Sequence, residues 1–298
     1  MKHTYNCFFH LLLAFSLLLL FELCCFWLEE LIRQNSKHKI PIIAKIEKPE
    51  AILNLDAILH AADGLMVARG DLGLEIPAEE VPLKQKLMVN KAKKARKPII
   101  IATQMMESMI DSLTPSRAEV NDVANSVMDG ADAVMLSGET SVGSYPVEVV
   151  QTIGKIIQGV ENSPLISVPD TLPEIHSKRV ITKAVCFQAC NIANELSASA
   201  ICTLTNSGYT AWQISSWRPS AIILVFTSNK RILSQLGLLW GVKCVYYDNF
   251  VSTDKTVEEV NELAIEKGFV KTGDLVINLA AMPVKEKGQV NTLRISRL

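Results

Sequence analysis

The sequence lacks an excess of charge of either sign. Its 298 residues carry 30 Lys and Arg against 31 Asp and Glu, which leaves a formal net charge of −1. Proteins that bind nucleic acid or anionic membrane surfaces through electrostatics usually have a marked basic excess. We therefore expect no nucleic acid among the partners. Apart from a leucine-rich N-terminus, the chain also contains no internal repeat and no low-complexity tract.

Paired metal-binding cysteines are also missing. The seven cysteines form no C-x-x-C motif, and their odd number and irregular spacing are typical of a reducing compartment. Cys186 and Cys190 lie four residues apart in a helical pattern, which predicts two small core residues rather than metal ligands. With 49% hydrophobic and 20% charged residues, global disorder is excluded, and the length suits one large or two ordinary domains.

One long apolar run stands apart from the rest of the chain. Residues 10–28 are interrupted only by Glu22, and Lys2 precedes them as in a signal peptide, yet no small-x-small cleavage site follows. Three interpretations stay open: a membrane or signal-like segment, a leader foreign to the remainder, or a helix of the folded core. We expect a cytoplasmic protein, with membrane association as the alternative if residues 10–28 are a genuine anchor.

From Ile40 onward, apolar strands alternate with amphipathic helices. The predicted strands are 40–46, 64–68, 99–102 and 131–136, and the predicted helices are 49–62, 77–95, 116–129 and 145–161. This order is typical of a parallel α/β architecture. A proline-bearing linker at 162–173 precedes a second α/β unit, with helices at 177–196, 207–217 and 255–267, another opened by Asn229, and strands at 200–204, 221–226, 242–246 and 274–278. The predicted organisation is an atypical leader (1–39), a first domain (40–165) and a second domain (166–298).

Polar residues follow three consecutive strands of the first domain. Lys45 and Glu47 are two positions apart on one strand, so their side chains share a face. Arg69, Gly70 and Asp71 follow the second strand, and Thr103 follows the third. Ligands in parallel α/β folds bind at the carboxyl ends of the strands. Each residue also has a purely structural interpretation, as a strand terminus or a helix cap, but their common position predicts one site.

The residue types indicate the chemistry of that site. The carboxylates of Glu47 and Asp71 suit a hard cation, Mg²⁺ or Mn²⁺. The ammonium of Lys45 suits negative charge on a transferring phosphoryl group or an enolate oxygen. Gly70 permits close approach of the backbone to an anion, and the hydroxyl of Thr103 can contact substrate or relay a proton through water.

Five segments carry a family resemblance: KIEKPEAILNLDAIL, ADGLMVARGDLGLEIP, KPIIIATQMMESMI, PSRAEVNDVANSVMDGADAVMLSGET and SYPVEVV. Together they resemble pyruvate kinase, most like the plant cytosolic form, and the resemblance covers Ile40 to Leu298, about the C-terminal half of such an enzyme. It implies a partial (β/α)8 TIM barrel, comprising the last strands only, followed by a three-layer α/β C-terminal domain with a mainly parallel sheet. It also implies a homotetramer.

The resemblance further implies phosphoryl transfer from phosphoenolpyruvate to ADP, giving pyruvate and ATP. Mg²⁺ (or Mn²⁺) is expected, and so is K⁺, whose ligands in the family lie outside this chain. By motif, Lys45 and Thr103 are expected to be catalytic, Lys45, Arg69, Gly70, Asp71 and Thr103 to bind substrate, and Glu47 and Asp71 to bind the metal.

The chain also departs from the family pattern. The family's earlier barrel strands and lid domain are not present, so we expect impaired activity. Two alternatives remain: a catalytically silent chain that only joins tetramers, and a metal-enolate aldolase or lyase. A possible effector loop consists of Thr205, Asn206, Ser207, Gly208, Tyr209 and Thr210, but it lacks basic residues. That loop is therefore interpreted first as a helix cap and only second as a phosphate site.

Overall fold

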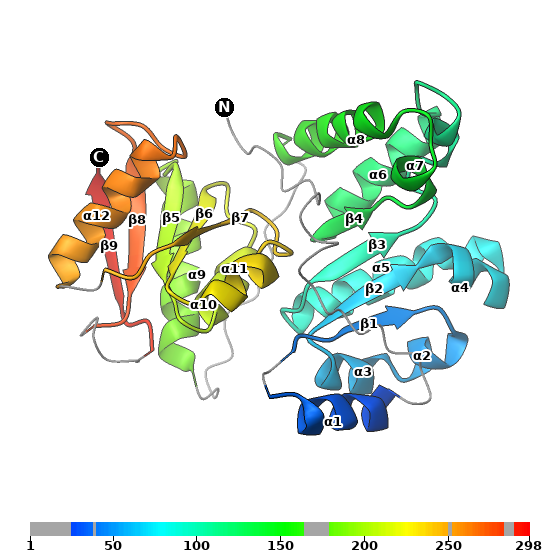
Figure 1. Ribbon diagram of the computed structural model, residues 1–298, viewed down its shortest axis with the longest axis horizontal. Helices are drawn as coiled ribbons and strands as arrows, with labels where there is room; N and C mark the ends of the chain where they lie inside the picture. The colour runs from blue at the N-terminus through cyan, green and yellow to red at the C-terminus, as the bar shows by residue number, and fades with distance from the viewer. Residues whose placement is uncertain (1–24, 38–39, 164–178, 250–251, 283–288) are drawn as a thin grey trace. The chain divides into compact units, whose positions relative to one another are not determined.

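The computed structural model describes residues 25–37, 40–163, 179–249, 252–282 and 289–298. Within these ranges the chain forms two compact units, one before and one after the predicted linker (Figure 1). Most of the linker and most of the predicted leader fall outside the described residues. No helix among the described residues is long and apolar enough to cross a membrane.

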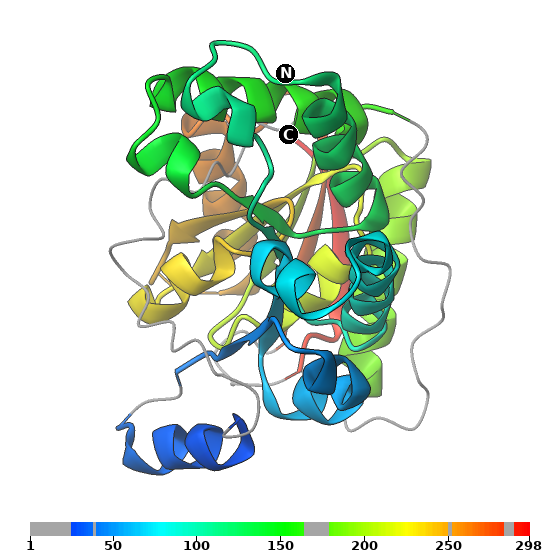
Figure 2. The same cartoon turned by 90° about the vertical axis from the view of Figure 1, so that its right-hand side faces the viewer.

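The N-terminal unit contains a four-stranded sheet whose strands lie in chain order and are all parallel. The strands are β1 (Ile43–Ile46), β2 (Gly64–Ala68), β3 (Ile99–Ala102) and β4 (Ala133–Met135). The helices are α1 (Cys25–Asn35), α2 (Pro49–Leu53), α3 (Leu55–Ala61), α4 (Arg69–Glu75), α5 (Val81–Lys94), α6 (Arg117–Asp129), α7 (Gly138–Ser141) and α8 (Pro146–Glu161), with short 3-10 turns at Ala78–Glu80 and Glu107–Ile110. Figures 1 and 2 show the alternation of strand and helix in this unit, from blue to green.

The register of the sheet places the Lys45 side chain on the face opposite the main core of this unit. Ile46, Val67 and Ile101 lie side by side on β1, β2 and β3, and all three are fully buried in the core shared with the helices. The opposite face carries Lys45 beside Met66, and both keep partial exposure. The period of two along a strand thus assigns Lys45 to the face that the main core does not cover.

Local signals explain the helix boundaries. Ser116 and Glu119 form a reciprocal capping box at the start of α6, and Gly130, with φ of 105°, ends that helix in the left-handed conformation. The helix predicted at 49–62 is instead divided at Asn54, whose side-chain Nδ2 donates to the carbonyl of Glu50 at 2.9 Å. A side chain that bonds to the preceding turn competes with the helical pattern of hydrogen bonds.

The helix α1 overlaps the end of the apolar run noted in the sequence. Its Arg33 donates to Asp63 Oδ2 at 3.1 Å and to the carbonyl of Ala61, also at 3.1 Å. The carboxylate of Asp63 also accepts from the backbone N–H of Ile42 at 3.0 Å. These contacts attach α1 to the end of α3 and to the start of β1.

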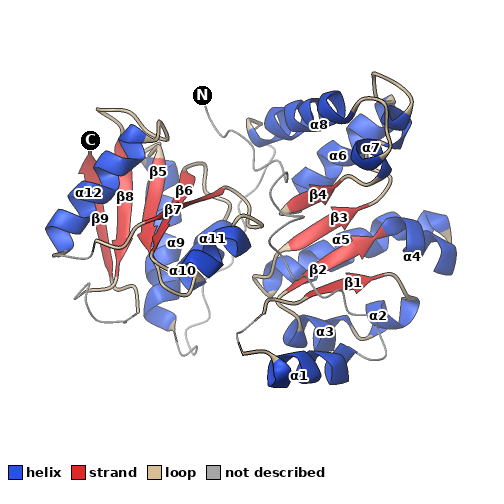
Figure 3. Ribbon diagram, in the orientation of Figure 1, coloured by secondary structure: helices blue, strands red, loops and turns tan. Residues whose placement is uncertain are grey.

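The C-terminal unit has three layers. Its sheet has the order β7-β6-β5-β8-β9, drawn red in Figure 3. The strands are β5 (Ala200–Leu204), β6 (Ile222–Thr227), β7 (Val242–Tyr246), β8 (Leu275–Ala280) and β9 (Thr292–Arg297), and the helices are α9 (Val180–Glu195), α10 (Tyr209–Ser216), α11 (Lys230–Leu236) and α12 (Thr253–Glu266). One apolar cluster joins the sheet to α9, α10 and α11, and another joins its other face to α12.

One strand of this sheet has no counterpart among the predicted elements. β9 pairs antiparallel with β8 at the edge of an otherwise parallel sheet. Its alternation of apolar and polar residues, with Leu293 and Ile295 between polar neighbours, is the signal that could have identified it. The sheet is therefore mainly parallel, as the fold class anticipated.

Candidate functional site

The candidate site lies where β1, β2 and β3 end. Lys45 is the third residue of β1, and Glu47 follows that strand directly. Asp71 lies in the first turn of α4, which begins at the residue after β2. Thr103 follows β3. Because parallel strands present their carboxyl ends at one edge, the fold brings these four residues to a common rim.

The ammonium of Lys45 joins the two acidic residues. Its Nζ donates to Asp71 Oδ2 at 2.8 Å and forms an ion pair with Glu47 Oε2. The side chain of Glu47 is only 8% exposed, whereas that of Asp71 is 53% exposed. The Lys45 ammonium therefore contacts one buried carboxylate, that of Glu47, and one that solvent can reach, that of Asp71.

These contacts shift the ionisation of the site in a consistent direction. Burial alone would lower the pKa of Lys45, but hydrogen bonds and charge interactions with Asp71 and Glu47 outweigh it and hold that pKa above 10.5. The hydrogen bond from Lys45 lowers the pKa of Asp71 below 3.8, against a smaller opposing effect of desolvation. Both groups are therefore charged throughout the neutral range.

The hydroxyl of Thr103 and the backbone of Gly70 are in direct contact. Thr103 Oγ1 accepts from the Gly70 N–H at 2.8 Å and donates to the carbonyl of Ala102 at 2.6 Å. The start of α4 and the end of β3 are thereby tied together at the rim. Gly70, Asp71 and Thr103 thus lie on adjacent segments, as their sequence positions predict.

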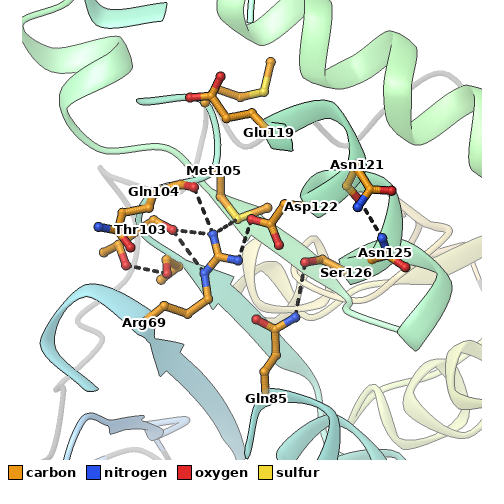
Figure 4. A network of polar contacts seen from close by, with 12 residues as sticks. Arg69, Gln85, Thr103, Gln104, Met105, Glu119, Asn121, Asp122, Asn125 and Ser126 are labelled. Atoms are coloured by element: carbon orange, nitrogen blue, oxygen red, sulfur yellow. Dashed lines mark hydrogen bonds and ion pairs between the residues drawn. The ribbon is translucent and has the colours of Figure 1, made fainter. Parts of the chain in front are cut away.

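Arg69 reaches the same rim, but its guanidinium is turned to acceptors of the protein. It donates to the carbonyls of Thr103 and Gln104 and to the carboxylate of Asp122, as Figure 4 shows. Asp122 lies on α6 and is not among the predicted site residues. Neither is Glu139, whose buried carboxylate accepts from the backbone N–H groups of Met106 and Ser137.

Two carboxylates at this rim fit a hard divalent cation. Mg²⁺ is commonly held in proteins by one or two carboxylates together with water and substrate oxygens, and Glu47 and Asp71 supply such a pair. Their shared contact with one ammonium shows that their oxygens already converge on a positive charge. No group of three or more His, Cys, Asp or Glu suited to a metal occurs within the described part of the chain.

The possible effector loop belongs to the C-terminal unit. Gly208 has φ of 78°, and its N–H donates to Thr205 Oγ1 at 3.0 Å just before α10 begins. The Tyr209 ring lies beneath the guanidinium of Arg179, 4.4 Å from its centroid. Thr205 Oγ1 and Ser207 Oγ accept backbone N–H groups at the start of α10, whose N-cap residue, Gly208, has no side-chain cap. Both interpretations of this loop, as a helix cap and as an effector site, stay predictions from the sequence.

Comparison with known proteins gives matches over both units. The model of "Pyruvate kinase, barrel domain" matches residues 28–150, and that of "Pyruvate kinase, alpha/beta domain" matches residues 183–296. Similar curated proteins include pyruvate kinases from Clostridium acetobutylicum (40% identity over 270 residues, 90% of this chain and 57% of the relative) and Geobacillus stearothermophilus (44% over 272 residues, 90% and 46%). Another is from Mycobacterium tuberculosis (43% over 260 residues, 87% and 54%). The chain thus spans about half the length of the curated relatives it matches.

Proposed function

Because the chain belongs to the pyruvate kinase family of phosphotransferases, we propose that its N-terminal unit transfers the phosphoryl group of phosphoenolpyruvate to ADP. The observation that carries this proposal is the contact of Lys45 with both Glu47 and Asp71 at the strand ends. The ammonium can stabilise negative charge on a transferring phosphoryl group, and the two carboxylates beside it can hold the cation that neutralises the substrate anions.

In the proposed reaction the bond between phosphorus and the enolate oxygen breaks, and a new bond forms to a terminal oxygen of ADP. Lys45 stabilises the negative charge on the transferring group, and its raised pKa keeps it protonated while it does so. The enolate left behind takes a proton at carbon, delivered through water that the Thr103 hydroxyl orients. Gly70 has no side chain, so the backbone at the start of α4 can lie close to the substrate anion.

Glu47 and Asp71 would hold Mg²⁺ or Mn²⁺. When bound, such an ion neutralises phosphate and carboxylate charge and acts as a Lewis acid. The lowered pKa of Asp71 keeps its carboxylate ionised and ready to bind a cation at neutral pH. The family's use of K⁺ is included in the proposal, without an assignment of its ligands to this chain.

Several finer features belong to the same proposal. We propose a partial barrel for the N-terminal unit, a homotetrameric assembly and a cytoplasmic location, each supported by the family assignment. The described sheet of four parallel strands, each followed by helices, is consistent with the last part of such a barrel. The family assignment also favours phosphoryl transfer over the aldolase or lyase alternative. The likeness to plant cytosolic forms stays a prediction from the motifs.

The test is pyruvate formation by the purified chain from phosphoenolpyruvate and ADP, with Mg²⁺ and K⁺ present. We expect impaired but measurable turnover, and we expect Glu47→Gln to lower kcat further, by about 100-fold or more, because a fixed charge at the reacting centre is lost. Glu75→Gln is the matched control, since Glu75 pairs with Lys48 nearby and is 40% exposed. Absence of turnover, or equal loss in both variants, would overturn the proposal.

A further inference from the structure

The corner after β3 has an unusual backbone. Thr103 has φ of 69° and Gln104 has φ of 53°, so two consecutive residues with side chains adopt the left-handed conformation. Residues other than glycine seldom take this conformation, because the Cβ atom approaches the following carbonyl oxygen. A corner of this kind persists only where its surroundings over-determine it. The corner carries the Thr103 hydroxyl, so whatever holds it also sets the position of that group.

Arg69 makes the contacts that hold this corner. Its Nη2 donates to the carbonyl of Thr103 at 2.6 Å and to that of Gln104 at 3.1 Å, and it lies 2.9 Å from Met105 Sδ. Its Nε also donates to the Thr103 carbonyl, at 3.3 Å. Figure 4 shows the guanidinium facing this group of acceptors. A planar guanidinium with fixed donor directions can satisfy successive carbonyls only if the backbone turns both toward it.

Asp122 completes the arrangement from a second element. Its Oδ2 accepts from Arg69 Nη1 at 2.6 Å, so the guanidinium lies between the corner and α6. The side chain of Arg69 is 9% exposed and that of Asp122 is 35% exposed. A buried guanidinium needs a partner of opposite charge, and the carboxylate of Asp122 supplies it. The same contact fixes the orientation of the guanidinium and its donor groups.

We propose that Arg69, oriented by Asp122, is a positioning residue that holds the Thr103–Gln104 corner in its left-handed conformation. Through that corner it places the Thr103 hydroxyl against the Gly70 N–H. The sequence motif suggested that Arg69 contacts substrate, whereas this geometry assigns it to the backbone of the rim. The effect of Arg69 on catalysis rests on the proposed function, but its hold on the corner does not.

The first measurement needs no catalytic activity. Hydrogen exchange of the segment 103–110, followed by mass spectrometry, reports opening of the corner, since the Met106 N–H is bonded to Glu139 just beyond it. We expect Arg69→Gln to speed this exchange about tenfold, because hydrogen bonds from a charged donor are lost. Lys86→Gln is the matched control. It removes an ion pair between Lys86 on α5 and Asp129 on α6, and it should leave the exchange rate of the segment 103–110 unchanged.

A compensating substitution separates positioning from direct contact. Glycine takes the left-handed conformation without steric penalty, so Gln104→Gly should restore much of the slow exchange in the Arg69→Gln background. It should also restore part of kcat for pyruvate formation, with the KM for ADP little changed. If Arg69 touched substrate directly, the glycine could restore the slow exchange but would not restore kcat, and the role of Arg69 as a positioning residue in catalysis would be wrong.

The remaining outcomes of these experiments distinguish the proposed function from the role of Arg69. If the wild-type chain forms no pyruvate, the proposed function fails while the exchange measurement still decides the role of Arg69. If Arg69→Gln does not fold, Asp122→Asn takes its place, because it removes only the partner charge from a partly exposed position. Exchange of the 103–110 segment at the wild-type rate in the folded variant would overturn the proposal.

Discussion

Replacing Lys45 by Met should strengthen the binding of a divalent cation at the rim. The Nζ of Lys45 lies 2.8 Å from Asp71 Oδ2 and also contacts Glu47. It therefore occupies the carboxylate oxygens that the ion would use, and it repels the ion as well. Met keeps the length and apolar character of the side chain while removing the charge. This variant consequently separates the electrostatic role of Lys45 from its packing.

The magnitude follows from the geometry. An ion bound to Asp71 Oδ2 at about 2.1 Å would lie about 5 Å from Nζ. Repulsion between a double and a single positive charge at that distance amounts to about 1.7 kcal/mol in bulk water. Since each 1.4 kcal/mol corresponds to about tenfold in affinity, the Kd should fall at least about tenfold. The side chains of Lys45 and Glu47 are only 21% and 8% exposed, so screening by water is incomplete and this value is a lower bound.

The assay is titration with Mn²⁺ alone, with free ion measured by electron paramagnetic resonance at low ionic strength. Lys91→Met is the control, because Lys91 forms an exposed ion pair with Asp56 on the same unit and should leave the Kd unchanged. Pyruvate formation by Lys45→Met should meanwhile fall by about 100-fold or more. Weaker Mn²⁺ binding in Lys45→Met would refute the reasoning, since it would mean that the ammonium assembles the carboxylates instead of competing for them.

Two further predictions concern other parts of the chain. Desolvation raises the pKa of Glu119, but hydrogen bonds from Ser108 and Ser116 outweigh it and hold that pKa below 4.5. A lowered pKa stabilises the folded state above pH 4.5 and ceases to do so as the pH falls through the folded value, so Glu119→Gln should lower the urea-unfolding free energy by about 1–2 kcal/mol at pH 7, and by less below pH 4.5. Equal losses at both pH values would contradict this. Burial raises the pKa of Cys202 to about 12, so iodoacetamide at pH 8 should label it only after unfolding, as measured by mass spectrometry of its peptide; rapid labelling of the folded chain would contradict the burial.

Much of the candidate site was predictable because it depends on short-range periodicity. Lys45 and Glu47 share a face of β1 since side chains alternate along a strand. Asp71 and Thr103 reach the same rim because they follow parallel strands that are neighbours in the sheet. The strand β9 was not predicted, although its alternation was visible. β9 is as long as β6 and β8, but four of its six residues are polar, so its hydrophobic signal is weak. Its antiparallel pairing with β8 is a feature of the tertiary structure.

What the sequence determined by itself is the order of the elements and the direction in which polar side chains leave the strands. Both follow from local hydrophobic periodicity and from the rule that parallel strands end at one edge. Only the tertiary structure decided that Arg69 would pair with Asp122, 53 residues along the chain, and that Thr103 and Gln104 would turn left-handed toward it. Residues with side chains carry no compositional mark of that conformation, since contacts with distant groups, and not local preference, stabilise it.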